Sequence, residues 1–125
     1  MRTLQTTTDV MGGSTTFTMA YMTTAFRDAN PKVTGALLKA LDEANRMIAA
    51  DKTAAADVFL DSVGRRGWTR DEIVEVLNDP EVKFTNTPEN VMKYAEFMHA
   101  IGSLKAKPES WKDVFVPEVH GLPGN

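Results

Sequence analysis

Two histidines and two acidic pairs are the residues whose chemistry could indicate catalysis or a metal ion. His99 lies in a segment with helical periodicity, and His120 lies in the proline-containing segment that follows. Neither has a second His, a Cys or a carboxylate at the spacing of a metal site. The pairs Asp42-Glu43 and Asp71-Glu72 fall on a polar helix face and in a first helical turn, where carboxylates are solvated or favour the helix dipole. The sequence therefore predicts no enzyme, no metal site and no cofactor.

One short segment has residue types that could hold a ligand. Gly12 and Gly13 precede Ser14, Thr15 and Thr16, and closely spaced backbone amides with neighbouring hydroxyls can hold an oxyanion. The same sequence is also typical of an ordinary turn. The lysine of a phosphate-binding loop is missing from the required position, which excludes a nucleotide loop. The candidate ligand-binding residues are Gly13, Ser14, Thr15 and Thr16.

Composition limits the class of protein. The 125 residues suffice for one unit, a single domain or part of one. With 14 Lys+Arg against 17 Asp+Glu the net charge is -3, so nucleic acid is not expected as a partner. The absence of cysteine excludes a disulfide framework and a thiolate nucleophile. No apolar run has the length of a membrane span, and the first residues lack a signal-peptide core. We therefore expect no membrane insertion and, for the chain as written, a cytoplasmic location.

Helices must position most of these residues, and the sequence marks where they begin. The residue types that favour helix N-termini are Asn30-Pro31, Asp51, Thr69 with Glu72 as a capping box, and Thr87-Pro88. Apolar residues recur at three- and four-residue spacing after each of these starts. The expected helices span residues 31–50, 53–63, 70–78 and 88–102. The methionines, which fall mostly on apolar helix stripes or in the N-terminal strand described below, are expected to fill the core. Arg65 and Arg66 are expected in a solvated loop with Trp68 packed back on the core.

The two ends of the chain differ from this helical centre. Residues 15–25 predict a strand, because β-branched and aromatic residues alternate with polar ones and place Phe17, Met19 and Tyr21 on one face. Residues 104–125 predict an extended tail with a short helical turn within 109–115. The fold class expected from the residues is therefore mainly α with one or two N-terminal strands.

Several strings of the sequence, in a fixed order, carry a family resemblance. They are GGSTTF at 12–17, FRDANP at 26–31, ALDEA at 40–44, LNDPEVKFT at 77–85, MKYAEFM at 92–98 and KPESWKDVF at 107–115. In this order the chain resembles the C-terminal portion of the substrate-binding proteins of ABC transporters. Within these proteins it resembles the branch that binds nitrate, sulfonates and taurine, which includes a thiamine-pyrimidine-synthesis-like family.

The resemblance implies a fragment of a two-lobed α/β periplasmic-binding-protein (type II) fold. Residues 1–25 would form a strand in the hinge region, 26–103 helices and 104–125 the tail. The implied function is capture of a small anionic or aromatic nutrient in the periplasm, for the permease of an ABC importer and without catalysis. Family members are longer, and their main ligand-holding loops lie in sequence that this chain does not have.

An alternative interpretation is a small helical self-associating protein-interaction module. Apolar helix faces and a strand without a neighbour would favour a homo-oligomer under either interpretation. An upstream open reading frame continuous with Met1 would favour the fragment, and an upstream stop codon would favour the module.

Overall fold

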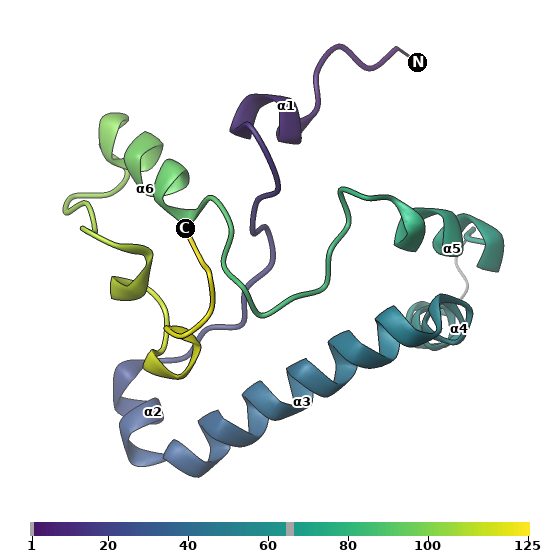
Figure 1. Cartoon of the computed structure of the whole chain (residues 1–125), viewed down its shortest axis with the longest axis horizontal. Coiled ribbons are helices and arrows are strands. Elements are labelled where there is room, and N and C mark those ends of the chain that lie inside the picture. The colour runs from purple at the N-terminus through teal and green to yellow at the C-terminus, as the bar shows by residue number, and fades with distance from the viewer. Residues whose placement is uncertain (1, 65–66) are drawn as a thin grey trace. The chain divides into compact units, whose positions relative to one another are not determined.

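The computed structural model describes residues 2–64 and 67–125, and it divides into two compact units. One unit comprises the residues up to Asp28 together with Thr87–Asn125, and the other comprises Ala29–Asn86. The fold is mainly helical, as the sequence predicts (Figure 1). The elements are α1 (Thr7–Met11), α2 (Thr24–Ala29), α3 (Pro31–Ala50), α4 (Lys52–Val63), α5 (Arg70–Asn78), α6 (Val91–Ala100) and the short 3₁₀ helices η1 (Trp111–Asp113) and η2 (Pro117–Val119). No helix within the described ranges combines the length and apolarity needed to cross a membrane.

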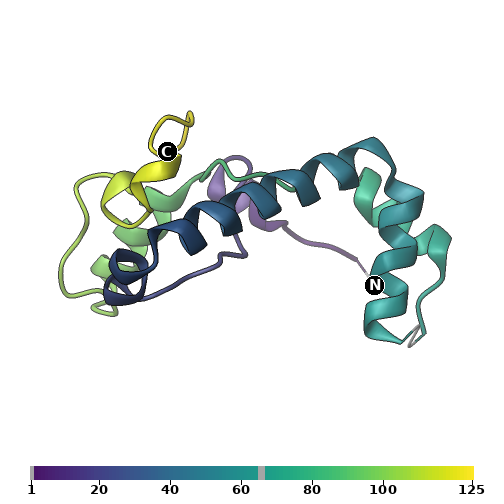
Figure 2. The same ribbon diagram turned by 90° about the horizontal axis from the view of Figure 1, so that it is seen from below.

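The unit Ala29–Asn86 contains α3, α4 and α5, and the sequence predicts all three. Asp51 caps α4 by accepting a hydrogen bond from the Ala54 amide at 2.9 Å. The expected capping box begins α5, where Thr69 and Glu72 each accept a hydrogen bond from the other's amide. Figures 1 and 2 show α4 beside α5. Their contact forms the small core of this unit, which consists of Ala56, Leu60 and Ile73, with Val74 and Leu77 packed against it.

Two details of this unit differ from the sequence prediction. Asn30 precedes α3 but makes no side-chain cap hydrogen bond, because its backbone (φ −132°, ψ 54°) is outside the extended geometry of a side-chain cap. Trp68 does not pack back on the core, since it is 51% exposed. The predicted loop residues Arg65 and Arg66 lie outside the described residues.

The predicted strand over residues 15–25 is not confirmed. Thr24 and Ala25 belong to α2, because Thr23 Oγ1 accepts a hydrogen bond from the Phe26 amide at 3.1 Å and so begins a helix. Within the described chain the backbone of residues 17–21 makes no hydrogen bond, and no strand is found there or elsewhere in 2–64 and 67–125. A strand requires a neighbouring strand to receive its backbone groups, and this segment has none.

Helix α6 begins at Val91, so the predicted start at Pro88 is wrong. Pro88 is fully buried, and the backbone of Glu89 pairs with Thr16, which holds both residues outside the helix. Asn90 then takes a left-handed conformation with φ 54° immediately before the helix. The helix ends at Ala100, close to the predicted end at Gly102.

Residues 104–125 are folded rather than extended throughout. The expected turn is present as η1, whereas η2 is not predicted by the sequence. Trp111 is buried, and its ring makes edge-to-face contacts with Phe115 at 6.0 Å and His120 at 5.7 Å between centroids. Asn125 joins this segment to the start of α6, because its carbonyl accepts from the Val91 amide at 2.9 Å and its side chain accepts from the Asn90 amide at 2.7 Å.

Candidate functional site

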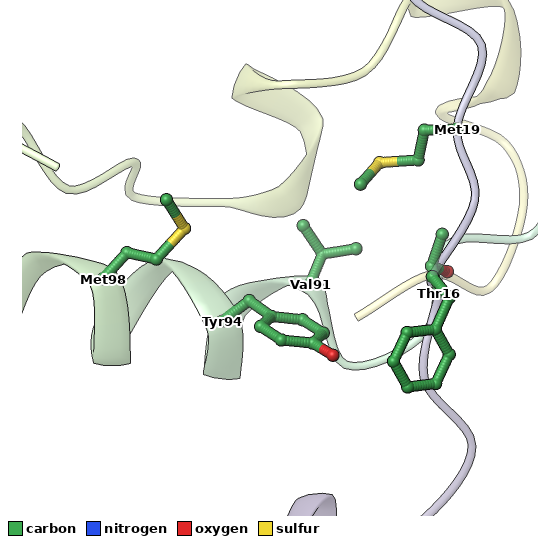
Figure 3. Close-up of a pocket in the computed structure, with 6 residues that line it drawn as sticks. Thr16, Met19, Val91, Tyr94 and Met98 are labelled. Atoms are coloured by element: carbon green, nitrogen blue, oxygen red, sulfur yellow. The ribbon is translucent and has the colours of Figure 1, made fainter. Parts of the chain in front are cut away.

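A groove of about 310 Å³ lies between the segment after Thr15 and helix α6, both within one unit (Figure 3). Its lining residues are Thr16, Phe17, Met19, Val91, Tyr94 and Met98. The side chains of Met19, Val91 and Met98 point into the same space. Phe17 and Tyr94 meet edge to face, with 6.4 Å between ring centroids and an interplanar angle of 75°. The groove therefore presents aromatic and thioether surface with few polar atoms.

Hydrogen bonds between distant segments hold the two walls of the groove together. The Thr16 amide donates to the Glu89 carbonyl at 2.9 Å, and the Glu89 amide donates to Thr16 Oγ1 at 2.9 Å. Asn90 Nδ2 donates to the Ser14 carbonyl at 2.7 Å. These three bonds fix the candidate ligand-binding segment against the residues that begin α6.

Helix α1 and its two glycines position the same segment from the other side. Gly12 (φ 71°) and Gly13 (φ 147°) adopt backbone conformations that side-chain-bearing residues rarely take. Both amides donate to the Thr8 carbonyl, at 2.8 and 3.1 Å, and so end α1. Lys93 Nζ donates to the carbonyls of Met11 at 2.7 Å and Val10 at 3.2 Å, which joins this helix end to α6.

The four residues predicted to contact a ligand are adjacent here, but their donors are largely engaged. Of the four, Thr16 lines the groove. The Gly13 amide is bound to Thr8, the Thr16 amide is bound to Glu89, and Thr15 Oγ1 donates to the Gly13 carbonyl at 3.2 Å. A small anion that used these three donors would have to replace their internal hydrogen bonds. Ligand contact by Gly13, Ser14, Thr15 and Thr16 stays a prediction.

The apolar lining residues were not predicted as site residues. Val91, Tyr94 and Met98 follow one helix stripe, and the sequence predicts such a stripe as core. The expectation that methionines fill the core is wrong for Met19 and Met98, which are 53% and 41% exposed. Two apolar patterns together could have indicated the groove: the helix stripe of Val91, Tyr94 and Met98, and the alternating apolar residues Phe17 and Met19.

Both histidines hold turns through backbone carbonyls. His99 Nδ1 lies 2.9 Å from the Leu104 carbonyl oxygen, and His120 Nε2 lies 2.9 Å from that of Phe115. Across residues 2–64 and 67–125, no three His, Asp or Glu side chains gather as a group that could hold a metal ion.

The acidic pairs also have structural partners. The Thr69 amide donates to the Glu72 carboxylate at 2.8 Å, and this bond lowers the pKa of Glu72 below its ordinary value. Asp42 pairs with Arg46 one helical turn later. These two carboxylates therefore act in helix capping and surface pairing.

No protein-family model matches the chain, and no curated protein or solved structure is significantly similar to it.

Proposed function

We propose that the chain is the carboxyl-terminal part of a solute-binding protein that captures a small molecule for an ABC importer. The support comes from the ordered strings of the sequence, from GGSTTF at 12–17 to KPESWKDVF at 107–115. In this proposal residues 1–25 form the hinge region, 26–103 the helices and 104–125 the tail of a two-lobed protein in the periplasm. The protein binds its solute and delivers it to a permease without chemical turnover.

One observation of the structure carries the proposal. The segment Gly13–Thr16, to which the family's ligand role would transfer, ends at a groove of about 310 Å³. That volume lies at the lower end of the range for small-molecule sites, roughly 300–1,000 Å³. The lining is mostly apolar with a hydroxyl from Thr16 and one from Tyr94, which is the usual composition of a small-molecule site.

The affinity of this chain for the solute should be low. In two-lobed binding proteins the contacts are shared across the cleft, and this chain supplies one part of them. Losing about three hydrogen bonds, each worth roughly 1 kcal/mol net, weakens binding on the order of a hundredfold. We therefore expect this chain to bind the solute on the order of a hundredfold more weakly than the whole protein does.

The test is nuclear magnetic resonance titration of the full chain, since this method detects millimolar binding. The compounds are nitrate, bicarbonate, taurine, alkanesulfonates and the pyrimidine precursors of thiamine. We expect one of them to shift the amide signals of residues 13–16 saturably, and Ser14→Ala to weaken that binding more than the control Thr18→Ala. Chemical conversion of any compound, or no saturable shift with any, would contradict the proposal.

A second candidate function is self-association, and a separate observation favours it. The backbone of residues 17–21 makes no hydrogen bond within the described chain, and the alternating side chains Phe17, Met19 and Tyr21 are 65%, 53% and 96% exposed. A segment with open backbone groups and an exposed apolar face can add a strand from a second copy.

Self-association is tested by sedimentation velocity at tens of micromolar, with Tyr21→Lys as the variant. In an antiparallel pair of residues 17–21, Tyr21 lies opposite Phe17 of the second copy, so a lysine at 21 removes an aromatic cross-strand pair. This variant should therefore sediment as a monomer while the parent chain forms a dimer or larger assembly. Leu4→Lys is the matched control, because Leu4 is 87% exposed but lies outside the segment. A monomeric parent chain would rule out this function.

A further inference from the structure

We propose that the groove between the segment Thr16–Met19 and helix α6 binds a neutral aromatic molecule of one or two rings. This inference rests on the proposed function, because it names the class of solute that the same site would take. The sequence alone leaves an anionic and an aromatic ligand open. The size of the groove, the chemistry of its lining and the state of the nearby donors together favour the aromatic one.

The size of the groove fits one or two fused rings. An apolar cavity of roughly 150 Å³ is sufficient to hold benzene, and this groove measures about 310 Å³. An inorganic anion such as nitrate or sulfate is bound through hydrogen-bond donors and would not fill an apolar space of this size.

The lining offers surfaces that interact with aromatic rings. Tyr94 and Phe17 already meet edge to face, and a third ring can continue such an arrangement with offset or edge contacts. Met19 and Met98 direct their side chains into the same space as Val91. Thioether sulfur makes favourable contacts with aromatic rings.

Several donors near the groove that an anion could use are engaged elsewhere. No charged side chain lines the groove. The adjacent cation, Lys93, donates to the carbonyls of Met11 and Val10 at the end of α1. The Gly13 and Thr16 amides donate to Thr8 and Glu89. Binding an oxyanion here would break bonds that fix the groove wall, whereas a neutral ring would leave them intact.

Tyr94, one of the lining residues, carries a polar atom at its ring edge. The Tyr94 ring takes part in the contact with Phe17, and within the described residues its hydroxyl makes no hydrogen bond. That hydroxyl can accept a hydrogen bond from a ring N–H or donate one to a ring nitrogen. A nitrogen-containing aromatic therefore fits the groove better than a pure hydrocarbon.

The experiment titrates the full chain with indole, and in parallel with sodium nitrate and sodium sulfate, while amide and methionine methyl signals are recorded. Indole is neutral, has two fused rings and carries one N–H. We expect indole to shift the signals of Met19, Val91 and Met98 saturably, and the two salts to leave them unchanged. Met98→Gln should weaken indole binding about fivefold or more, because it replaces apolar lining with a polar amide.

Phe97→Gln is the matched control for Met98→Gln. Phe97 precedes Met98 in the same helix, is 61% exposed and does not line the groove, so this change should leave indole binding within about twofold. Indole shifts that do not saturate, or equal effects of the two variants, would overturn the inference. A salt that shifts residues 13–16 while indole does not would overturn the inference but support solute capture. Absence of binding by indole and by every solute would contradict both.

Discussion

Gly124 packs so closely on Trp111 that a single methyl group should measurably destabilise its unit. A Cβ at this position would lie 2.9 Å from Trp111 Cε2, 3.0 Å from Cζ2 and 3.1 Å from Pro88 Cδ. Carbon atoms in contact are normally about 3.5–4.0 Å apart, so three contacts would each be too short by roughly half an ångström or more. Gly124 has no positive φ, so Gly124→Ala introduces no backbone strain in the folded state beyond these contacts.

The neighbouring groups cannot move away at low cost. Trp111 is 7% exposed and its ring is held by edge contacts with Phe115 and His120. The chain at Gly124 is fixed by its own amide, which donates to Leu122 at 2.9 Å, and by the Asn125 amide, which donates to Pro88 at 3.2 Å. Overpacking of this kind costs about 1–3 kcal/mol.

An opposing effect reduces the expected loss. Replacing glycine by alanine restricts the unfolded chain and stabilises the folded state by about 0.4–1 kcal/mol. The net loss in free energy of unfolding is therefore roughly 0–2.6 kcal/mol, and relative to Gly121→Ala, which shares the unfolded-state gain, about 1–3 kcal/mol. For a unit of this size each 1 kcal/mol lowers Tm by roughly 4–8 °C.

The assay is denaturant unfolding followed by the fluorescence of Trp111. The variant Trp68→Phe is used as background, because Trp68 is exposed and belongs to the other unit. Gly121→Ala is the matched control, since a Cβ there meets no atom within 4 Å. Our reasoning is refuted if Gly124→Ala is as stable as Gly121→Ala.

Two further predictions concern the helices of the other unit. Leu60→Ala removes a fully buried side chain between α4 and α5 and should lower the free energy of unfolding by about 2–5 kcal/mol, whereas Val58→Ala, at a position 70% exposed, should change it by less than about 0.5 kcal/mol. Circular dichroism during urea unfolding measures both, and equal midpoints would contradict the assigned core. The hydrogen bond from the Thr69 amide lowers the pKa of Glu72 in the folded state below its ordinary value of 4.5. The capping box therefore contributes its full stability at pH values above 4.5, and this contribution is lost as the pH falls through the folded-state pKa. Glu72→Gln should therefore flatten the acid dependence of helix content, and an unchanged pH profile would count against the box.

The helices that follow local rules are the part of the fold that the sequence predicts best. A capping box at Thr69 and a left-handed glycine at Gly64 act within one turn of the chain, so a single sequence reveals them. The start of α6 depends instead on pairing between Glu89 and Thr16, which are 73 positions apart. Such a contact leaves no local pattern, and the cap-then-proline rule at Pro88 consequently failed.

The same difference between local and long-range contacts applies to the candidate site. Gly12 and Gly13 indicate a special backbone, and the structure gives both a positive φ. The sequence does not reveal where the Thr16 amide donates, because its acceptor, the Glu89 carbonyl, is brought to it by the packing of this segment against the start of α6. The apolar groove likewise results from two segments meeting, and each of them alone has the pattern of a core element.

The segment between Val10 and Phe26 contains no charged side chain, and this argues that residues 17–21 are built to be paired. Exposed edge strands normally carry a lysine, a proline or a bulge that prevents pairing with another chain. Here the backbone of 17–21 is open and Tyr21 is 96% exposed. The partner is a strand of the other lobe if the chain is part of a solute-binding protein, and a second copy if it is a self-associating module. Amide hydrogen exchange tests the second copy: protection at 17–21 that grows with protein concentration requires it, whereas fast exchange at every concentration excludes it.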